Sequence, residues 1–187
     1  MQNMQRWSLL ILLTVVTLSA GCTSSYKPVS EWEQRVREAS TIDVYPGDVR
    51  SDLEGYRSRQ VAWAGVITRV SIDETAQPPL MHLDLDHKFF SWAEDATTRQ
   101  FWLSPRGEGT FSTSWPMQEG WDLDEMLRLI ETADMMIAYG TAKSVSADGR
   151  IQLGQAAYVR HIPKAGFRMD RIEYGRPGEP TKILHAP

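Results

Sequence analysis

The feature that most constrains the fold is the order of strand-like and helix-like segments after residue 60. Residues 60–72 are rich in Val, Ile and Thr, which favour strands. Residues 80–88 alternate apolar and polar side chains with the period of two expected of a half-buried strand. Residues 98–103 predict a third strand, and residues 111–115 continue its pairing beyond a bulge. The sequence therefore predicts three strands before any long helix.

One helix and a hairpin follow these strands. Asp122 is a favoured N-cap residue, and apolar residues recur after it at helical spacing on one face. Residues 135–143 and 150–162 predict two strands, joined by an Asp-Gly turn that is typical of hairpins. Three strands, one helix and a two-stranded hairpin is the order of elements in the OB fold, a Greek-key barrel. We therefore predict an all-β domain with one capping helix, a five-stranded OB-like barrel over residues 41–164.

Other segments flank or modify this barrel. Ser30 followed by Glu33 has the pattern of a capping box and predicts a short N-terminal helix over residues 31–39. Gly65 lies inside the first barrel strand, where a glycine usually marks a bulge or a bend. Residues 165–187 are polar and contain two prolines, so we expect a loosely ordered C-terminal tail.

The N-terminal region indicates a cellular location. Residues 7–20 form an uncharged apolar run after Arg6, shorter than a transmembrane helix and laid out like a secretory signal. The segment Leu18-Ser19-Ala20-Gly21-Cys22 resembles the lipobox of bacterial lipoproteins. That resemblance implies a signal peptide over residues 1–21, cleavage before Cys22, and acylation of Cys22 with palmitate-type chains. Because Cys22 is the only cysteine, an acylated chain has no thiol left for a disulfide.

The same resemblance implies a destination. In lipoproteins generally, a residue other than aspartate after the cysteine directs sorting to the outer membrane, and Thr23 is such a residue. We therefore expect a lipid anchor in the cell outer membrane, with the protein on the periplasmic face. Residues 23–28 are small, polar and proline-ended, so residues 22–40 are predicted to be an acylated flexible tether followed by the short helix.

Short motifs in the barrel region resemble a particular family. The segments VAWAGVI (residues 61–67), Tyr139-Gly140 and DGRI (residues 148–151) are similar to the starvation-inducible outer-membrane lipoprotein family called Slp. The resemblance covers residues 45–162. It implies a cell-envelope lipoprotein and brings no catalytic residues with it.

Charge limits the expected partners. The chain has 20 basic and 24 acidic residues and a formal net charge of −4. Nucleic-acid binding depends on clustered Lys and Arg, and docking on anionic lipid depends on basic patches. The composition therefore predicts no nucleic-acid partner, and it predicts membrane attachment through the acyl chains. An envelope protein is the expected macromolecular partner.

One strand carries residue types that bind metals. His82, Asp84 and Asp86 are two residues apart and so point to the same face of their strand. Imidazole and carboxylate ligands suit a divalent metal such as zinc or manganese. The alternative, which the default polar-out pattern of antiparallel sheets favours, is the solvated side of an amphipathic strand.

A second candidate site is the loop-rich stretch between residues 90 and 109, which combines charge, aromatic area and glycines. Its candidate binding residues are Trp92, Glu94, Asp95, Arg99, Arg106 and Glu108. The alternative, which we favour, is an ion-pair network that ties a long loop to the barrel. The sequence contains neither Gly-x-Ser-x-Gly nor His-Glu-x-x-His, and only a triad of distant residues stays open as a hydrolase. We predict a non-catalytic binding or structural module without a cofactor, with a metal-binding periplasmic protein as the alternative.

Overall fold

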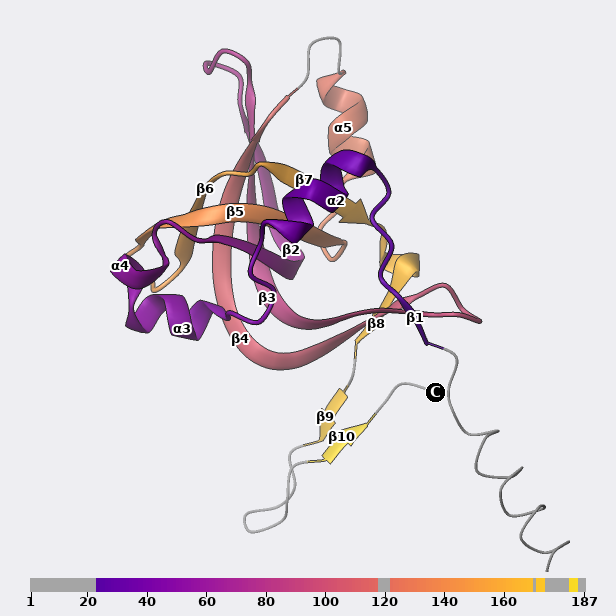
Figure 1. Ribbon diagram of the computed structural model, residues 1–187. Coiled ribbons are helices and arrows are strands. Elements are labelled where there is room, and N and C mark those ends of the chain that lie inside the picture. The colour runs from indigo at the N-terminus through magenta and orange to yellow at the C-terminus, as the bar shows by residue number, and fades with distance from the viewer. Residues whose placement is uncertain (1–22, 118–121, 170, 174–181, 185–187) are drawn as a thin grey trace, which may run out of the picture.

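The structure is a computed structural model in which residues 23–117, 122–169, 171–173 and 182–184 are described (Figure 1). The helices are α2 (Glu31–Glu38), α3 (Pro46–Ser51), α4 (Leu53–Tyr56), α5 (Leu123–Leu129) and the 3-10 helix η1 (Lys164–Gly166). The strands are β1 (Thr23–Ser25), β2 (Gln60–Asp73), β3 (Leu80–Asp95), β4 (Phe101–Pro116), β5 (Met135–Val145), β6 (Ile151–Gln155), β7 (Tyr158–Ile162), β8 (Phe167–Met169), β9 (Arg171–Glu173) and β10 (Lys182–Leu184).

Five strands close into a barrel. β2 pairs antiparallel with β3, and β3 pairs antiparallel with β4. β4 then pairs in parallel with β6, β6 pairs antiparallel with β5, and β5 returns antiparallel to β2. The helix α5 lies in sequence between β4 and β5, and Ile130 just after it packs into the core. This closed ring with its single intervening helix is the OB arrangement, so the predicted all-β OB-like fold is confirmed.

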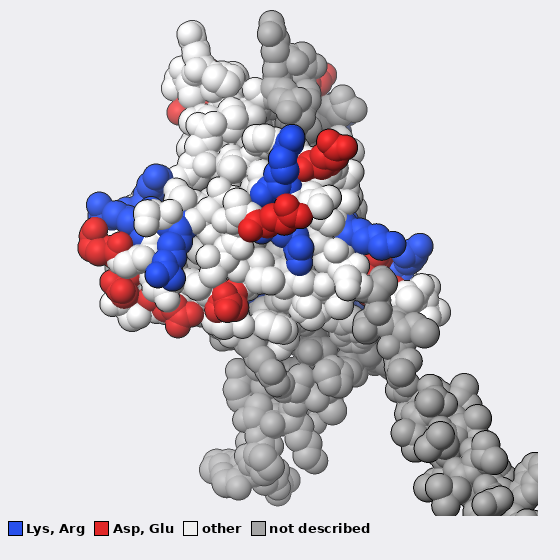
Figure 2. Space-filling model, in the orientation of Figure 1, with Lys and Arg blue, Asp and Glu red and all other residues white. Residues whose placement is uncertain are grey.

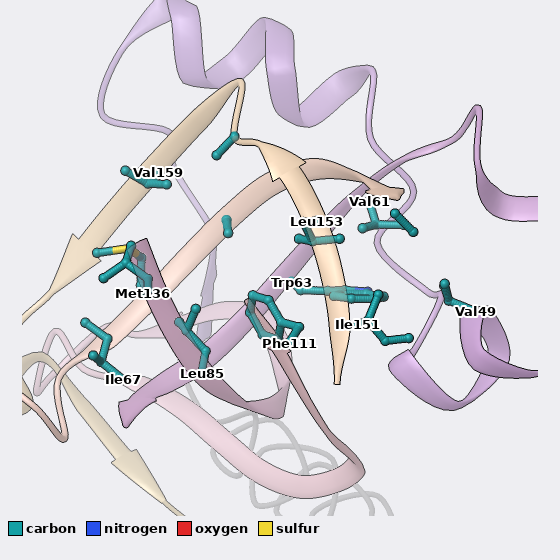
Figure 3. Close-up of a cluster of buried hydrophobic side chains, with 14 of the residues drawn as sticks. Val49, Val61, Trp63, Ile67, Leu85, Phe111, Met136, Ile151, Leu153 and Val159 are labelled. Carbon is teal, nitrogen blue, oxygen red and sulfur yellow. The ribbon is translucent and has the colours of Figure 1, made fainter. Parts of the chain in front are cut away.

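The barrel strands β2 and β5 are covered on both faces. The inner side chains of β2, including Trp63 and Ile67, meet Phe111 of β4 and Ile151 of β6 in the barrel core (Figure 3). The outer face of β2 and β5 is covered as well, by a second apolar cluster that includes Val36 of α2. Because both faces are covered, these strands have nearly continuous apolar sequences rather than alternating ones.

Gly65 lies at the corner where β2 changes partners. Gly65 pairs with Met136 of β5 and also with His87 of β3. A Cβ atom on residue 65 would lie 2.9 Å from the Asp86 carbonyl oxygen and 2.9 Å from a ring carbon of Phe111. The predicted bend is therefore a close approach that only glycine allows, and the register irregularity of β2 comes later, between Ile67 and Arg69.

Several elements differ from the predicted ones. β3 continues to Asp95, so much of the stretch expected to be a loop is a β3–β4 hairpin. The reason is burial, because Phe90 and Leu103 of this hairpin pack into the second cluster. The short helix α3 has no counterpart among the predicted elements. Pro46 lies in its first turn, and the Asp48 carboxylate accepts a hydrogen bond from the Tyr45 N–H.

The N-terminal and C-terminal segments that the sequence predicts to be flexible are paired with the sheet where the structure describes them. β1 pairs antiparallel with β3, and Tyr26 directly after it is only 5 % exposed, so residues 23–28 are not a flexible tether. At the other end, β8 pairs in parallel with β4 and buries Phe167, so the predicted loose tail begins later than residue 165. In both segments an aromatic side chain completes the second apolar cluster, and this burial outweighs the local polar composition.

Candidate functional site: the hairpin extension and the N-terminal latch

The β3–β4 hairpin continues beyond the barrel, and we call residues 89–95 and 101–104 the hairpin extension. Its boundary is a register shift, because His87 pairs with Gly109 whereas Phe89 pairs with Ser104. Residues 105–108 of β4 therefore form a bulge opposite a single residue of β3. β1 lies on the β3 edge of the extension and β8 lies on its β4 edge, which makes a four-stranded sheet outside the barrel (Figure 1).

Trp92, one of the candidate binding residues, is half-buried in the aromatic packing of the extension. Its ring centroid lies 4.9 Å from that of Phe90 and 5.2 Å from that of Tyr26. The guanidinium of Arg37 lies 5.0 Å from the Trp92 ring centroid, in cation–π geometry. Trp92 therefore joins α2 and the N-terminal segment to the hairpin.

The charged residues at the end of the extension bond to one another. Arg99 lies 3.7 Å from the Glu94 carboxylate. The Asp95 carboxylate accepts hydrogen bonds from the backbone N–H groups of Thr98 at 2.7 Å and Thr97 at 2.8 Å, and these bonds hold the pKa of Asp95 below its usual range. These contacts join residues at the end of the hairpin to one another, and an ion-pair network between this loop and the barrel stays a prediction. The side chains of Arg106 and Glu108 lie outside the described part of the chain.

His87 lies at the junction between the barrel and the extension. Its Nδ1–H donates a hydrogen bond of 2.6 Å to the Gly107 carbonyl, and its ring contacts those of Trp63, Tyr45 and Phe111. The side chain is only 3 % exposed, and burial lowers the pKa of His87 to about 4. A pocket beside it, lined by residues that include Tyr45, His87 and Trp92, has room for about one water molecule. The imidazole is therefore neutral at physiological pH and braces the bulge.

A buried carboxylate fastens the N-terminal segment to the barrel, and we call Tyr26, Glu33, Tyr139 and Arg160 the N-terminal latch. Glu33 is fully buried and accepts hydrogen bonds from the hydroxyls of Tyr26 and, at 3.0 Å, Tyr139. It also accepts the Val29 N–H at 2.7 Å, and Arg160 lies 3.7 Å away. Burial, with the carboxylate nearby, raises the pKa of both tyrosines, so their hydroxyls stay protonated as donors.

Arg160 connects the latch to the preceding backbone. Its Nη1 donates to the Lys27 carbonyl at 3.1 Å, and its guanidinium lies 4.7 Å from the Tyr26 ring centroid. In the sequence only Glu33 carries a signal for this site, as the second member of a capping box. The Ser30 hydroxyl does accept the Glu33 N–H at 3.1 Å, but the carboxylate turns inward to the tyrosines. Nothing local in the sequence marks Tyr139 or Arg160 as its partners, because they lie more than 100 residues away.

The candidate metal residues share one face of β3, as the period of two predicts, but one of their carboxylates, that of Asp84, is paired with a guanidinium. Arg150 lies 2.5 Å from Asp84 and 3.4 Å from Asp148, and the charge of Asp86 acts on it as well. Among the residues that the structure describes, no group of three or more His, Cys, Asp or Glu side chains is placed to hold a metal ion. His82, Asp84 and Asp86 therefore belong to a polar strand face with an internal ion pair.

The protein is a small OB-like barrel with a docked N-terminal segment and a four-stranded extension. No family model matches the chain, and no curated protein matches it. A search of solved structures found similarity to a small single-stranded DNA-binding protein from Streptomyces coelicolor, with 14% sequence identity and a TM-score of 0.36. That similarity covers 55% of this chain and 89% of that one.

One prediction is corrected by this comparison. The sequence predicts that nucleic acid is excluded as a partner, and the similarity to a single-stranded DNA-binding protein contradicts that exclusion. The exclusion rested on net charge alone, and charge summed over a chain does not describe the local surface. In Figure 2, basic and acidic side chains occur in small mixed groups over the visible face. None of the helices in the described ranges is long and apolar enough to cross a membrane.

Proposed function

We propose that this protein is a lipid-anchored lipoprotein of the cell envelope, attached to the outer membrane on its periplasmic face through acyl chains on Cys22. The observation that carries the proposal is the position of Cys22, directly after a signal-like apolar run and one residue before β1. More than one acyl chain is needed for stable anchoring, because each buried methylene contributes about 0.8 kcal/mol. Lipoprotein-type modification supplies several chains.

We further propose that the barrel is a non-catalytic binding or structural module. The support comes from the polar side chains buried in the described part of the chain, which are engaged in bonds that hold the fold. His87 donates to Gly107, and Glu33 accepts from the tyrosines of the latch. Asp134 accepts from His161 Nε2 at 2.8 Å and from the Lys164 N–H at 2.9 Å. Groups committed in this way brace strands and turns rather than face a substrate.

The test is metabolic labelling of the full chain in a bacterial host with radioactive palmitate, followed by separation of membranes from soluble proteins. The parent protein is expected to carry the label and to sediment with the outer membrane. Cys22→Ser is expected to lose the label and the membrane attachment. Ser25→Ala, which changes a nearby exposed residue and keeps the cysteine, is the matched control and should behave like the parent. Label retained by Cys22→Ser, or an unlabelled soluble parent, overturns the proposal.

A further inference from the structure

We infer that the turn between β3 and β4, residues 96–100, lies against the lipid headgroups, so that the barrel is held on the membrane in one orientation. The inference rests on the proposed acylation of Cys22. It goes further because a lipoprotein on a flexible tether has no fixed orientation, whereas here the anchored residue is next to a particular end of the folded domain. The partner surface is a lipid bilayer, and the contact residues are those of the turn.

The register of β1 places its first residue, Thr23, beside this turn. Thr23 pairs with Asp95, and Ser25 pairs with Ala93. Because the two strands are antiparallel, β1 begins beside Asp95, where β3 leads into the turn, and Cys22 is bonded directly to that first residue of β1. Consecutive Cα atoms are about 3.8 Å apart, so one peptide unit separates the acylated residue from the end of the extension.

Tyr26 and Lys27, which follow β1, are bonded to the folded domain, so they do not form a flexible linker between the membrane and the barrel. The Tyr26 N–H donates to the Trp92 carbonyl at 2.9 Å, which continues the ladder beyond β1. The Tyr26 ring is buried, and its hydroxyl is bonded to Glu33. Arg160 then holds the Lys27 carbonyl at 3.1 Å. Backbone and side chain therefore both fix the five residues that follow the anchor.

The chemistry of the turn suits a headgroup layer. Ala96, Thr97, Thr98 and Arg99 are exposed, so the turn presents small and hydroxyl side chains with one cation. The nearest carboxylates are occupied within the extension, Asp95 by backbone N–H groups and Glu94 by Arg99. The other edge is braced too, because the Gln100 side chain donates to the Ala165 carbonyl at 2.8 Å. Residues 96–99 themselves contain no carboxylate, and the turn that they form is polar and bonded to its surroundings.

The opposite end of the same strand provides a reference position. β3 has 16 residues, which at about 3.3 Å each corresponds to roughly 50 Å of strand path between its two ends. The turn between β2 and β3, residues 74–79, therefore lies at the far end of β3 from the anchor (Figure 1). A membrane-facing orientation places residue 98 near the headgroups and residue 74 far from them. Both Thr98 and Glu74 are exposed, so both positions accept a label.

The test uses the acylated full chain, in which the lipid blocks Cys22 and an introduced cysteine is the only free thiol. Thr98→Cys and Glu74→Cys are each labelled with a small fluorophore and reconstituted into phosphatidylethanolamine–phosphatidylglycerol vesicles that carry headgroup-spin-labelled lipid. Quenching is expected to be several-fold stronger at residue 98 than at residue 74. Equal quenching at the two positions, or stronger quenching at residue 74, overturns the inference.

Two further measurements separate the causes of failure. Flotation of the labelled proteins with the vesicles reports the anchor alone, so loss of flotation refutes the proposed function, whereas flotation with equal quenching refutes only the orientation. Ser24→Pro in β1 removes a backbone N–H and weakens the pairing with β3, while leaving Cys22 in place. In the Ser24→Pro protein, the difference in quenching between a label at residue 98 and a label at residue 74 is expected to fall markedly. Ser25→Ala is the control. A Ser24→Pro protein that floats with an unchanged difference shows that β1 pairing does not set the orientation.

Discussion

Lowering the pH from 7.5 to 5 is expected to destabilise this protein through one buried side chain, His87. Burial lowers the pKa of His87 to about 4 in the folded state, and the positive charge of Lys88 acts in the same direction. An unfolded chain has the ordinary histidine pKa of about 6.5. Between these two values the unfolded state binds a proton that the folded state does not, so stability falls as the pH falls from 6.5 toward 4.

The magnitude follows from the two pKa values. Proton linkage gives a loss of about 2 kcal/mol from the free energy of unfolding between pH 7.5 and pH 5, and about 3 kcal/mol when the transition is complete. The carboxylates with lowered pKa, Asp73, Asp95, Asp134 and Asp148, contribute stability that is lost only as the pH falls below about 4. The contribution of these four carboxylates to stability therefore stays nearly constant above pH 5.

The assay is urea denaturation of the full chain at several pH values between 5 and 7.5, followed by circular dichroism. His87→Gln keeps a donor for the Gly107 carbonyl and does not titrate, so its stability should lose most of the pH dependence, whatever its absolute value. His82→Gln removes an exposed histidine and is the matched control, with the parental slope expected. A His87→Gln protein whose stability falls with pH as steeply as the parent refutes the reasoning.

Two further substitutions test how the fold is held together. Glu33→Ala is expected to cost about 3–5 kcal/mol in urea denaturation, because it leaves the buried tyrosine hydroxyls without their acceptor and Arg160 without its counter-charge. A cost under about 1 kcal/mol would contradict the latch. Gly65→Ala is expected to cost about 1–3 kcal/mol, since the new Cβ meets backbone and a ring carbon at 2.9 Å. Gly47→Ala is its control, with nothing within 4 Å of the added Cβ, and an equal cost at both positions would count against the close approach.

The barrel strands were predictable because their signals are local. The alternation in β3 and the Asp-Gly turn between β5 and β6 both follow from which side chains face the core over a few residues. In the hairpin extension, the strand over residues 98–103 was predicted and matches the first part of β4, whereas the continuation of β3 to Asp95 was not predicted. Its strand residues are polar by composition at Ser91, Glu94 and Asp95, and they pair because β1 and β8 arrive from the two ends of the chain.

The candidate sites also combine features that follow from local sequence with contacts that depend on distant residues. The period of two correctly placed His82, Asp84 and Asp86 on one face, but the cation that pairs with Asp84 is Arg150, which comes from the β5–β6 turn. Glu33 was predicted as a helix cap, a local role. Its bond to Tyr139 spans 106 positions of sequence, and no pattern within a short window carries that information.

The sequence by itself determined the order of the barrel elements, the OB-like ring and the side of β3 that faces inward, because these depend on periodicity and turn chemistry over a few residues. Only the tertiary structure decided that residues 23–26 bond to β3 and that Glu33 turns inward. The physical reason is that burial of Tyr26 and Phe167 needs partners from distant strands, and such contacts exist only once the chain has closed.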